Sequence, residues 1–334
     1  MLRAVVATAS NDHRLGANEA PPAIISVYLG SQLQQVFDQI SKGETTSSAH
    51  AGVMELGVDT LPVFAKDPGD RNRTSPFAFT GNRFEFRAVG SNQSVSGPLV
   101  AMNTILTDSL TWAADALESA MAQGTELNAA IHTILKDVMD KHGAVVFGGN
   151  GYSEEWHKMA VEERGLLNLR TTADALPVLK ADDIKELFER VGVLSSVELE
   201  SRFEVYAEQY ILAIDVEAKL MVTMAKTTIY PAAMRYHSEL STTIVNAKAI
   251  GIELSKESAV KVAVLIGSMM DNASKLDAIM GKHDFGSIEE HMQYCAQTIR
   301  PSMDEVRKYA DALEGEVADD FWPLPTYQEM LFVK

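Results

Sequence analysis

Residues 71–87 constrain the fold of this chain most, because they set four arginines and one glutamate among apolar residues. In the second half of the segment, Arg83, Glu85 and Arg87 alternate with two phenylalanines. Successive side chains of a β-strand point to opposite faces of the sheet. The alternation therefore predicts a strand with three charges on one face and two aromatic rings, packed on a core, on the other.

The charged face predicts a ligand site. Arginine binds carboxylate and phosphate groups through two parallel hydrogen bonds, and a carboxylate between arginines stays ionised and open to a hard cation. The pattern thus favours a site for phosphate, carboxylate and a divalent metal. A solvated strand face that carries only local ion pairs is the alternative that the spacing leaves open.

Composition narrows the possible partners. The chain has 334 residues, of which 46% are hydrophobic and 22% charged, and it has no apolar run long enough to cross a bilayer. Its formal charge of -17 would repel a nucleic-acid backbone. We therefore expect a cytoplasmic protein with no nucleic-acid or membrane partner. Cys295 is the only cysteine, which excludes an internal disulfide, and we expect it to be a small buried residue.

The character of the sequence changes along the chain. An extended segment that passes into a helix is predicted at 23–40, and turn-rich segments surround the charged strand. After Lys180 one amphipathic helix follows another. The helices are predicted at 99–121, 127–138, 182–191, 196–228, 232–250, 255–280 and 287–313.

The C-terminal segment 321–332 is apolar and interrupted by prolines. A free end seldom carries so many large apolar groups. We expect this segment either to fold back over the core of its own chain or to pack on a neighbouring subunit.

Two motifs, found in order, resemble the C-terminal portion of a glutamine synthetase. The first is Asn-Asp-His-Arg-Leu-Gly-Ala-Asn-Glu-Ala-Pro at 11–21, and the second runs from Arg-Asn-Arg at 71–73 to Phe-Glu-Phe-Arg at 84–87. The stretches at 152–158 and 165–177, with the helical extension, are similar to the large bacterial type III branch. Together these stretches cover nearly the whole chain.

The resemblance implies both a fold and an activity. Residues 1–178 would form the C-terminal part of an α+β catalytic domain, and residues 179–334 a helical, bundle-like extension with an apolar tail. The implied enzyme is an ATP-dependent ligase: ATP phosphorylates the side chain of glutamate, ammonia displaces the phosphate, and Mg²⁺ or Mn²⁺ holds the phosphoryl groups. The family builds ring oligomers, so a homo-oligomer is implied for the intact enzyme.

Motif by motif, the resemblance implies roles for three residues before the charged strand. Arg14 would contact the glutamate substrate. Glu19 is similar to the flap carboxylate that closes the site and helps to deprotonate ammonium. Arg73, the second arginine of Arg-Asn-Arg, would stabilise the phosphoryl group in transfer.

The charged strand itself would complete this half of the site. Arg83 would face the nucleotide phosphates, and Arg87 would lie near substrate or phosphate. Glu85 matches a metal-ligand glutamate, and carboxylate oxygen suits magnesium or manganese.

The sequence departs from the family pattern in two ways. A further arginine of the better-known branch is replaced here by Ala78 or its neighbour Phe79. The other metal ligands and the N-terminal domain of the family belong upstream of Met1. We therefore expect little or no activity from this polypeptide alone. The alternative is a non-catalytic assembly or regulatory fragment that binds intact synthetase subunits.

Overall fold

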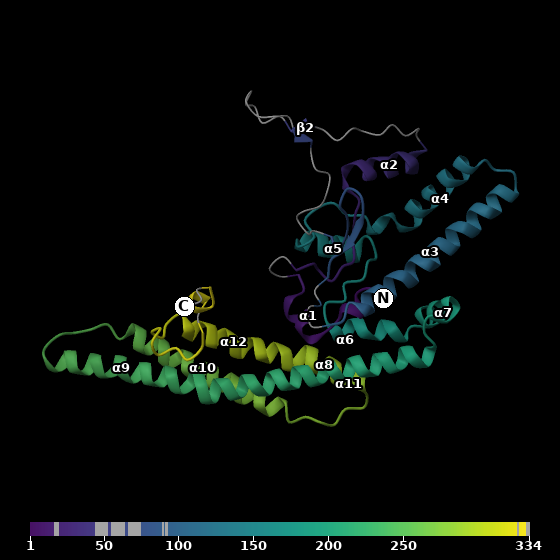
Figure 1. Cartoon of the computed structure of the whole chain (residues 1–334). Coiled ribbons are helices and arrows are strands. Elements are labelled where there is room, and N and C mark those ends of the chain that lie inside the picture. Colours follow the sequence, from purple (N-terminus) through teal and green to yellow (C-terminus); the bar gives the residue numbers. More distant parts are fainter. Residues whose placement is uncertain are drawn as a thin grey trace. The chain divides into compact units, whose positions relative to one another are not determined.

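A computed structural model describes residues 1–16, 20–43, 53–54, 64–65, 75–88, 90, 93–325 and 327–331. The chain divides into two compact units, Met1–Tyr206 and Ala207–Lys334 (Figure 1). The division falls inside one long helix, α8 (Ser196–Met224). The boundary predicted at residue 178 separates a catalytic part from a helical extension. It is a division by function, which the two compact units do not test, and it stays a prediction.

A three-stranded sheet lies in the first unit. Its strands are β1 (Val27–Tyr28), β4 (Phe77–Phe79) and β5 (Phe84–Phe86), in the order β1-β4-β5. β1 pairs with β4 in parallel, and β4 with β5 antiparallel. The backbone also forms a separate antiparallel pair, β2 (Val53–Met54) with β3 (Phe64–Ala65).

The helices of the first unit follow the predicted segments closely. In α5 the side chain of Ser153 accepts a hydrogen bond from the amide of Trp156, so this serine caps the helix. α3 and α4 form a helical hairpin (Figure 1). The helices are η1 (Ala4–Val6), α1 (Ala9–Arg14), α2 (Gly30–Lys42), α3 (Ser96–Ala122), α4 (Leu127–His142), η2 (Gly143–Val145), α5 (Glu154–Glu162), α6 (Thr172–Ala175), η3 (Leu176–Lys180) and α7 (Asp182–Val191).

Trp156 anchors α5 to the sheet. Its ring is buried and stacks on Phe147 with 3.6 Å between the ring centroids. Phe147 in turn donates its amide hydrogen to the carbonyl of Val27 in β1. The guanidinium of Arg164 lies 5.2 Å from the Trp156 ring and donates to the carbonyl of Val146 at 2.9 Å. The segment 152–158, singled out by its resemblance, thus has a packing role.

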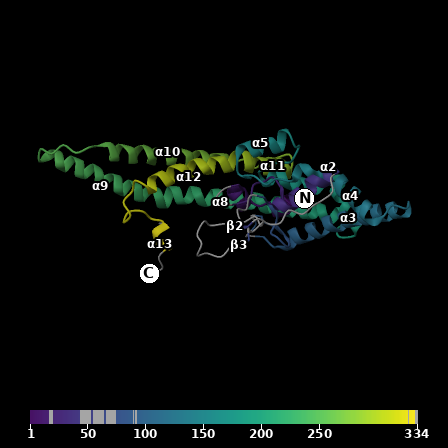
Figure 2. The ribbon, with the colours of Figure 1, turned by 90° about the horizontal axis from the view of Figure 1, so that it is seen from above.

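The second unit is a helical bundle, as the amphipathic pattern predicts. α10 packs against both α9 and α12 (Figures 1 and 2), and it buries a stripe of apolar residues at spacings of three and four. The segments after α8 are η4 (Ala225–Ile229), α9 (Tyr230–Ala249), α10 (Glu257–Ile279), α11 (Ile288–Tyr294), η5 (Cys295–Ile299), α12 (Arg300–Glu314) and α13 (Tyr327–Leu331).

Pro231 does not separate two helices, as the predicted segments 196–228 and 232–250 imply, whereas the predicted helix 287–313 already runs through Pro301. Pro231 and Pro301 each follow a single π-helical segment, η4 and η5, inside a helix that continues. Proline lacks an amide hydrogen, and its ring clashes with the carbonyl four residues earlier in an α-helix. The wider π turn accommodates the ring, so the predicted break at 228–232 is absent from the structure.

The predicted fold class is confirmed: a small sheet with helices is followed by a mostly helical region. Cys295 is buried, and burial raises the pKa of its thiol to about 11, with a further contribution from Asp215. No helix in the described ranges is both long and apolar enough to span a membrane.

Candidate functional site

The aromatic rings of the β4–β5 hairpin share one face of the sheet. Phe84 of β5 pairs with Phe79 of β4, and its ring stacks on that of Phe77 with 5.3 Å between centroids. This face is only partly a core, because Phe84 is 45% exposed. The expectation that both rings of β5 lie in a packed core therefore holds incompletely, and part of this aromatic surface is open.

The charged face brings together the three residues predicted from their spacing. Arg83 donates two hydrogen bonds to Oε1 of Glu85, from Nε at 3.0 Å and from Nη2 at 2.9 Å. Arg87 donates two to Oε2, each at 3.3 Å. Both oxygens of Glu85 are therefore engaged by guanidinium groups.

These contacts set the charge of the face. The hydrogen bond from Arg83 is the largest of the effects that lower the pKa of Glu85, and Arg87 adds to them, so the carboxylate stays ionised. The side chains are 71% exposed for Arg83, 33% for Glu85 and 19% for Arg87. A cluster of two cations and one anion carries a net positive charge, and its exposed arginine is free to turn toward an incoming anion.

The same contacts limit metal binding. Mg²⁺ and Mn²⁺ take oxygen ligands, but both oxygens of Glu85 already accept two hydrogen bonds each. Within the described ranges, no group of three or more His, Cys, Asp or Glu side chains is placed to hold a metal ion. The residues seen here thus do not form a metal site by themselves.

Buried hydroxyl groups fix the position of the β4–β5 hairpin. The Ser26 hydroxyl donates to that of Ser75 at 3.1 Å, and the Ser75 hydroxyl donates to the carbonyl of Phe147 at 3.2 Å. Both serines are fully buried. At the turn, Gly81 has a φ of 96°, a conformation that glycine adopts without strain. The charged face is therefore held on a fixed support.

The other predicted site residues are placed less fully. Arg14 ends α1 and is exposed to solvent. Glu19 and Arg73, the two predicted catalytic residues, lie outside the described residues. The roles of all six site residues stay predictions.

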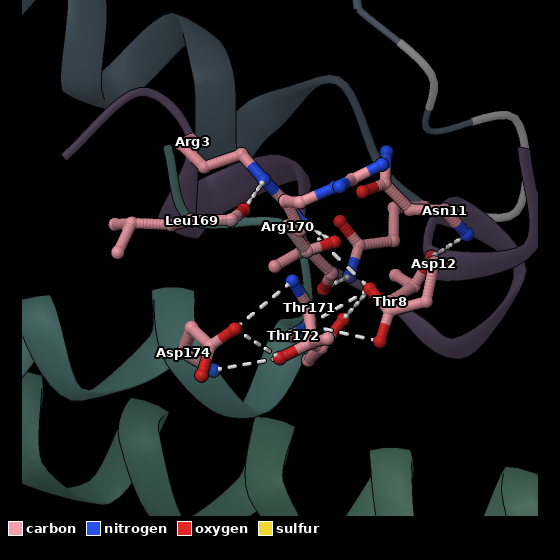
Figure 3. Close-up of polar contacts among 11 residues, drawn as sticks. Arg3, Thr8, Asn11, Asp12, Leu169, Arg170, Thr171, Thr172 and Asp174 are labelled. Carbon is pink, nitrogen blue, oxygen red and sulfur yellow. Dashed lines mark hydrogen bonds and ion pairs between the residues drawn. The ribbon is translucent and has the colours of Figure 1, made fainter. Parts of the chain in front are cut away.

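A buried network that the sequence did not reveal lies beneath the first motif (Figure 3). The Asp12 carboxylate accepts the amide hydrogen of Thr172 at 2.8 and 2.9 Å and the Thr172 hydroxyl at 2.8 Å. Nη2 of Arg3 lies 3.6 Å from the same carboxylate. These three side chains are buried, and the contact joins two motif stretches that are 160 residues apart.

Arg3 extends the network to the segment before α6. It donates from Nε to the carbonyl of Leu169 at 2.8 Å. Burial lowers the pKa of Arg3 and the Asp12 charge opposes this effect, so the pair compensates itself. In the sequence, the one signal for this network was Arg3 itself, because a charge within an apolar run such as 1–9 needs a buried partner.

Comparison with known proteins identifies relatives along the whole chain. Residues 130–248 match the model of the glutamine synthetase C-terminal domain. All of the chain aligns with a type-3 glutamine synthetase of Dictyostelium discoideum at 39% identity, covering 46% of that protein. All of it also aligns with a glutamine synthetase of Bacteroides fragilis at 35% identity, covering 47% of that protein.

A third relative, a glutamine synthetase of Butyrivibrio fibrisolvens, is 34% identical over 99% of the chain, with 47% of its own length covered. The chain thus spans about half the length of the curated relatives it matches. The predicted resemblance to the C-terminal portion of a type III glutamine synthetase is confirmed.

Proposed function

We propose that this chain supplies the C-terminal portion of a type III glutamine synthetase, a ligase that joins glutamate and ammonia at the expense of ATP through a γ-glutamyl phosphate. The observation that best supports the proposal is the charged face of β5, where Arg83 and Arg87 hold Glu85. This is the face that phosphoryl transfer needs, because its transition state spreads negative charge over oxygen atoms.

The proposed roles follow the motifs. Arg83 binds the nucleotide phosphates, and Arg87 lies near substrate or phosphate. Arg73 stabilises the phosphoryl group in transfer. Arg14 binds the glutamate substrate, and Glu19 closes the site and accepts a proton from ammonium. The buried hydrogen bonds that fix the β4–β5 hairpin support this assignment, because catalytic cations act best when they are already in place.

The proposed enzyme uses ATP as a substrate and Mg²⁺ or Mn²⁺ as its metal, which would neutralise phosphate charge. Glu85 would offer one carboxylate, but two arginines compete for its oxygens. The remaining metal ligands therefore come from residues other than those described. We further propose a cytoplasmic enzyme that assembles as a homo-oligomeric ring.

An activity assay tests the missing half of the site. The polypeptide of 334 residues is expected to release little or no phosphate in the presence of ATP, glutamate and ammonium, because Glu85 cannot hold a pair of metals alone. Phosphate release at the rate of an ordinary synthetase would contradict this part of the proposal.

Anion binding tests the half of the site that is present. Titration calorimetry with ATP should show binding that weakens several-fold in Arg83→Ala, because the most exposed cation of the face is lost. Glu85→Gln should bind ATP more tightly than the parent, because both arginines lose their internal anion. Arg190→Ala is the control, since Arg190 pairs with Asp108 at 2.7 Å elsewhere in the unit. Equal affinities in Arg83→Ala and Arg190→Ala would reject the assignment.

A further inference from the structure

We propose that the free end of the α9–α10 hairpin, residues 237–264, is a contact surface for the same hairpin end of a second copy of the chain. The inference rests on the proposed homo-oligomer and goes beyond it by naming the surface. It is independent of the catalytic assignment.

The hairpin end lies beyond the helix that covers the rest of α10. α12 packs along α10, and the ion pair between Lys261 and Glu316, at 2.5 Å, marks where that cover stops. On α9, the ring of Phe321, which follows α12, contacts the ring of Tyr236 with 5.7 Å between centroids. Figures 1 and 2 both show α9 extending past the end of α12. Among the described residues of α9, none after Ala233 is buried, so toward the tip the two helices cover one another only in part.

This uncovered end is unusually apolar. A groove of about 510 Å³ runs between the two helices, with Ile244 and Val245 on one wall and Val260 and Val264 on the other. Two antiparallel helices cannot bury their outer apolar sides without a further partner. The exposed large apolar residues of the hairpin end are Val245, Ile250, Ile252, Leu254, Val260 and Val264.

Charge indicates that the partner is another copy. The chain carries 46 acidic and 29 basic residues, so most of its surfaces repel a second copy. Residues 237–264 carry three lysines and three glutamates, and with Glu316, which pairs with Lys261, the local net charge is only -1. A two-fold axis would bring the apolar centres of two hairpin ends together with little repulsion between the copies.

The α3–α4 hairpin shows that exposed apolar residues alone do not favour self-contact. It also exposes large apolar side chains, including Leu106 and Leu110. Its residues 96–142, however, carry six acidic side chains against two lysines. Two copies of that face would repel each other more strongly than two copies of the α9–α10 end.

The size of the surface sets the expected strength. Thirteen residues of α9 span about 20 Å, and a face two helices wide gives on the order of 400 Å² per copy. A total of about 800 Å² is below the usual size of a stable interface, which predicts weak, concentration-dependent association. Each copy would make one such two-fold contact, in addition to the different contacts that close a ring.

Sedimentation velocity over a range of concentrations tests the surface. The parent chain should show a mass that rises with concentration, and Val260→Asp/Val264→Asp should stay monomeric over the same range. Leu110→Asp, on the α3–α4 hairpin, is the matched control and should associate like the parent. Circular dichroism checks that each variant is folded. A parent that is monomeric throughout, association that survives the double substitution, or loss of association in Leu110→Asp alone would each overturn the proposal.

Disulfide trapping gives a second measurement that does not weaken the surface. Val245→Cys should form a covalent dimer under mild oxidation, whereas the parent should not, because Cys295 is fully buried. A Leu110→Cys variant that dimerises as fast as Val245→Cys would argue against this contact. ATP binding by the same proteins tests the catalytic assignment separately, so the failure of one proposal would not affect the other.

Discussion

Glu85 and Asp12 are both carboxylates held by arginine, but they lie in opposite environments. Glu85 is one-third exposed, and its partners are side chains of its own hairpin. The Asp12 side chain is fully buried, and it accepts two of its hydrogen bonds from a backbone amide 160 residues away. The Glu85 carboxylate is held by arginine side chains two residues away, and the Asp12 carboxylate by a backbone amide from a distant part of the chain.

The difference separates a contact that maintains structure from one that is available for binding. A buried charge pair costs several kcal/mol if one partner is removed, because the other remains buried without compensation. An exposed pair contributes little to stability and exchanges partners readily. By this reasoning Asp12 fixes the first motif against α6, whereas the exposed Arg83 can exchange Glu85 for a ligand.

Asp12→Ala should have the largest effect. It removes the acceptor of three hydrogen bonds and leaves Arg3 charged and buried. We expect a loss of about 3–5 kcal/mol in the free energy of unfolding, measured by urea denaturation. A loss below about 1 kcal/mol would remove the distinction between the two carboxylates, because it would place Asp12 in the range of surface pairs.

Thr172→Val should have an intermediate effect. It removes the hydroxyl that donates to Asp12 but keeps the amide hydrogen bonds. We expect a loss of about 1–3 kcal/mol. The double variant with Asp12→Ala should lose less than the sum of the two single losses, since both act on one network. Strict additivity in this cycle would show that the contact is not coupled.

Thr171→Ala should have a smaller effect. Thr171 caps α6: its hydroxyl accepts from the amide of Asp174, and the Asp174 carboxylate accepts from the amide of Thr171. A lost cap of this kind costs about 1 kcal/mol. In the same denaturation experiment, this variant should lose less free energy of unfolding than Thr172→Val. The reverse order would show that the cap contributes more to stability than the Thr172 hydroxyl.

Glu85→Gln should have the smallest effect, lowering the urea midpoint at pH 7 only slightly, because an exposed ion pair contributes little to stability. Arg83 and Arg87 lower the pKa of Glu85, so any stabilisation is present above the unfolded-state value, about 4.3, and is lost as the pH falls through the lower folded-state pKa. A carboxyl titration by NMR should show that pKa rising more in Arg83→Ala than in Arg87→Ala, because Arg83 is the largest cause of the shift. An unshifted pKa in the parent would contradict the contacts of the charged face.

Local patterns in the sequence predict the elements well and the distant contacts poorly. The alternation at 83–87 predicts both the strand and the side-chain face, because both depend on neighbours two residues apart. The pairing of Arg3 with Asp12 and Thr172 depends on long-range packing, for which no local period exists. For the same reason the sequence does not reveal the uncovered end of α9–α10, since exposure depends on where α12 stops.

The two prolines show a limit of helical periodicity. A helix wheel drawn straight through Pro231 assumes one rotation of about 100° per residue. The π segment Ala225–Ile229 holds an extra residue in one turn, which sets every later side chain back by about that angle. The apolar side of α9, which packs on α10, is therefore rotated by about that angle relative to the apolar side of α8. Deleting one residue from 225–229 would turn all of α9 about its own axis while leaving its sequence intact.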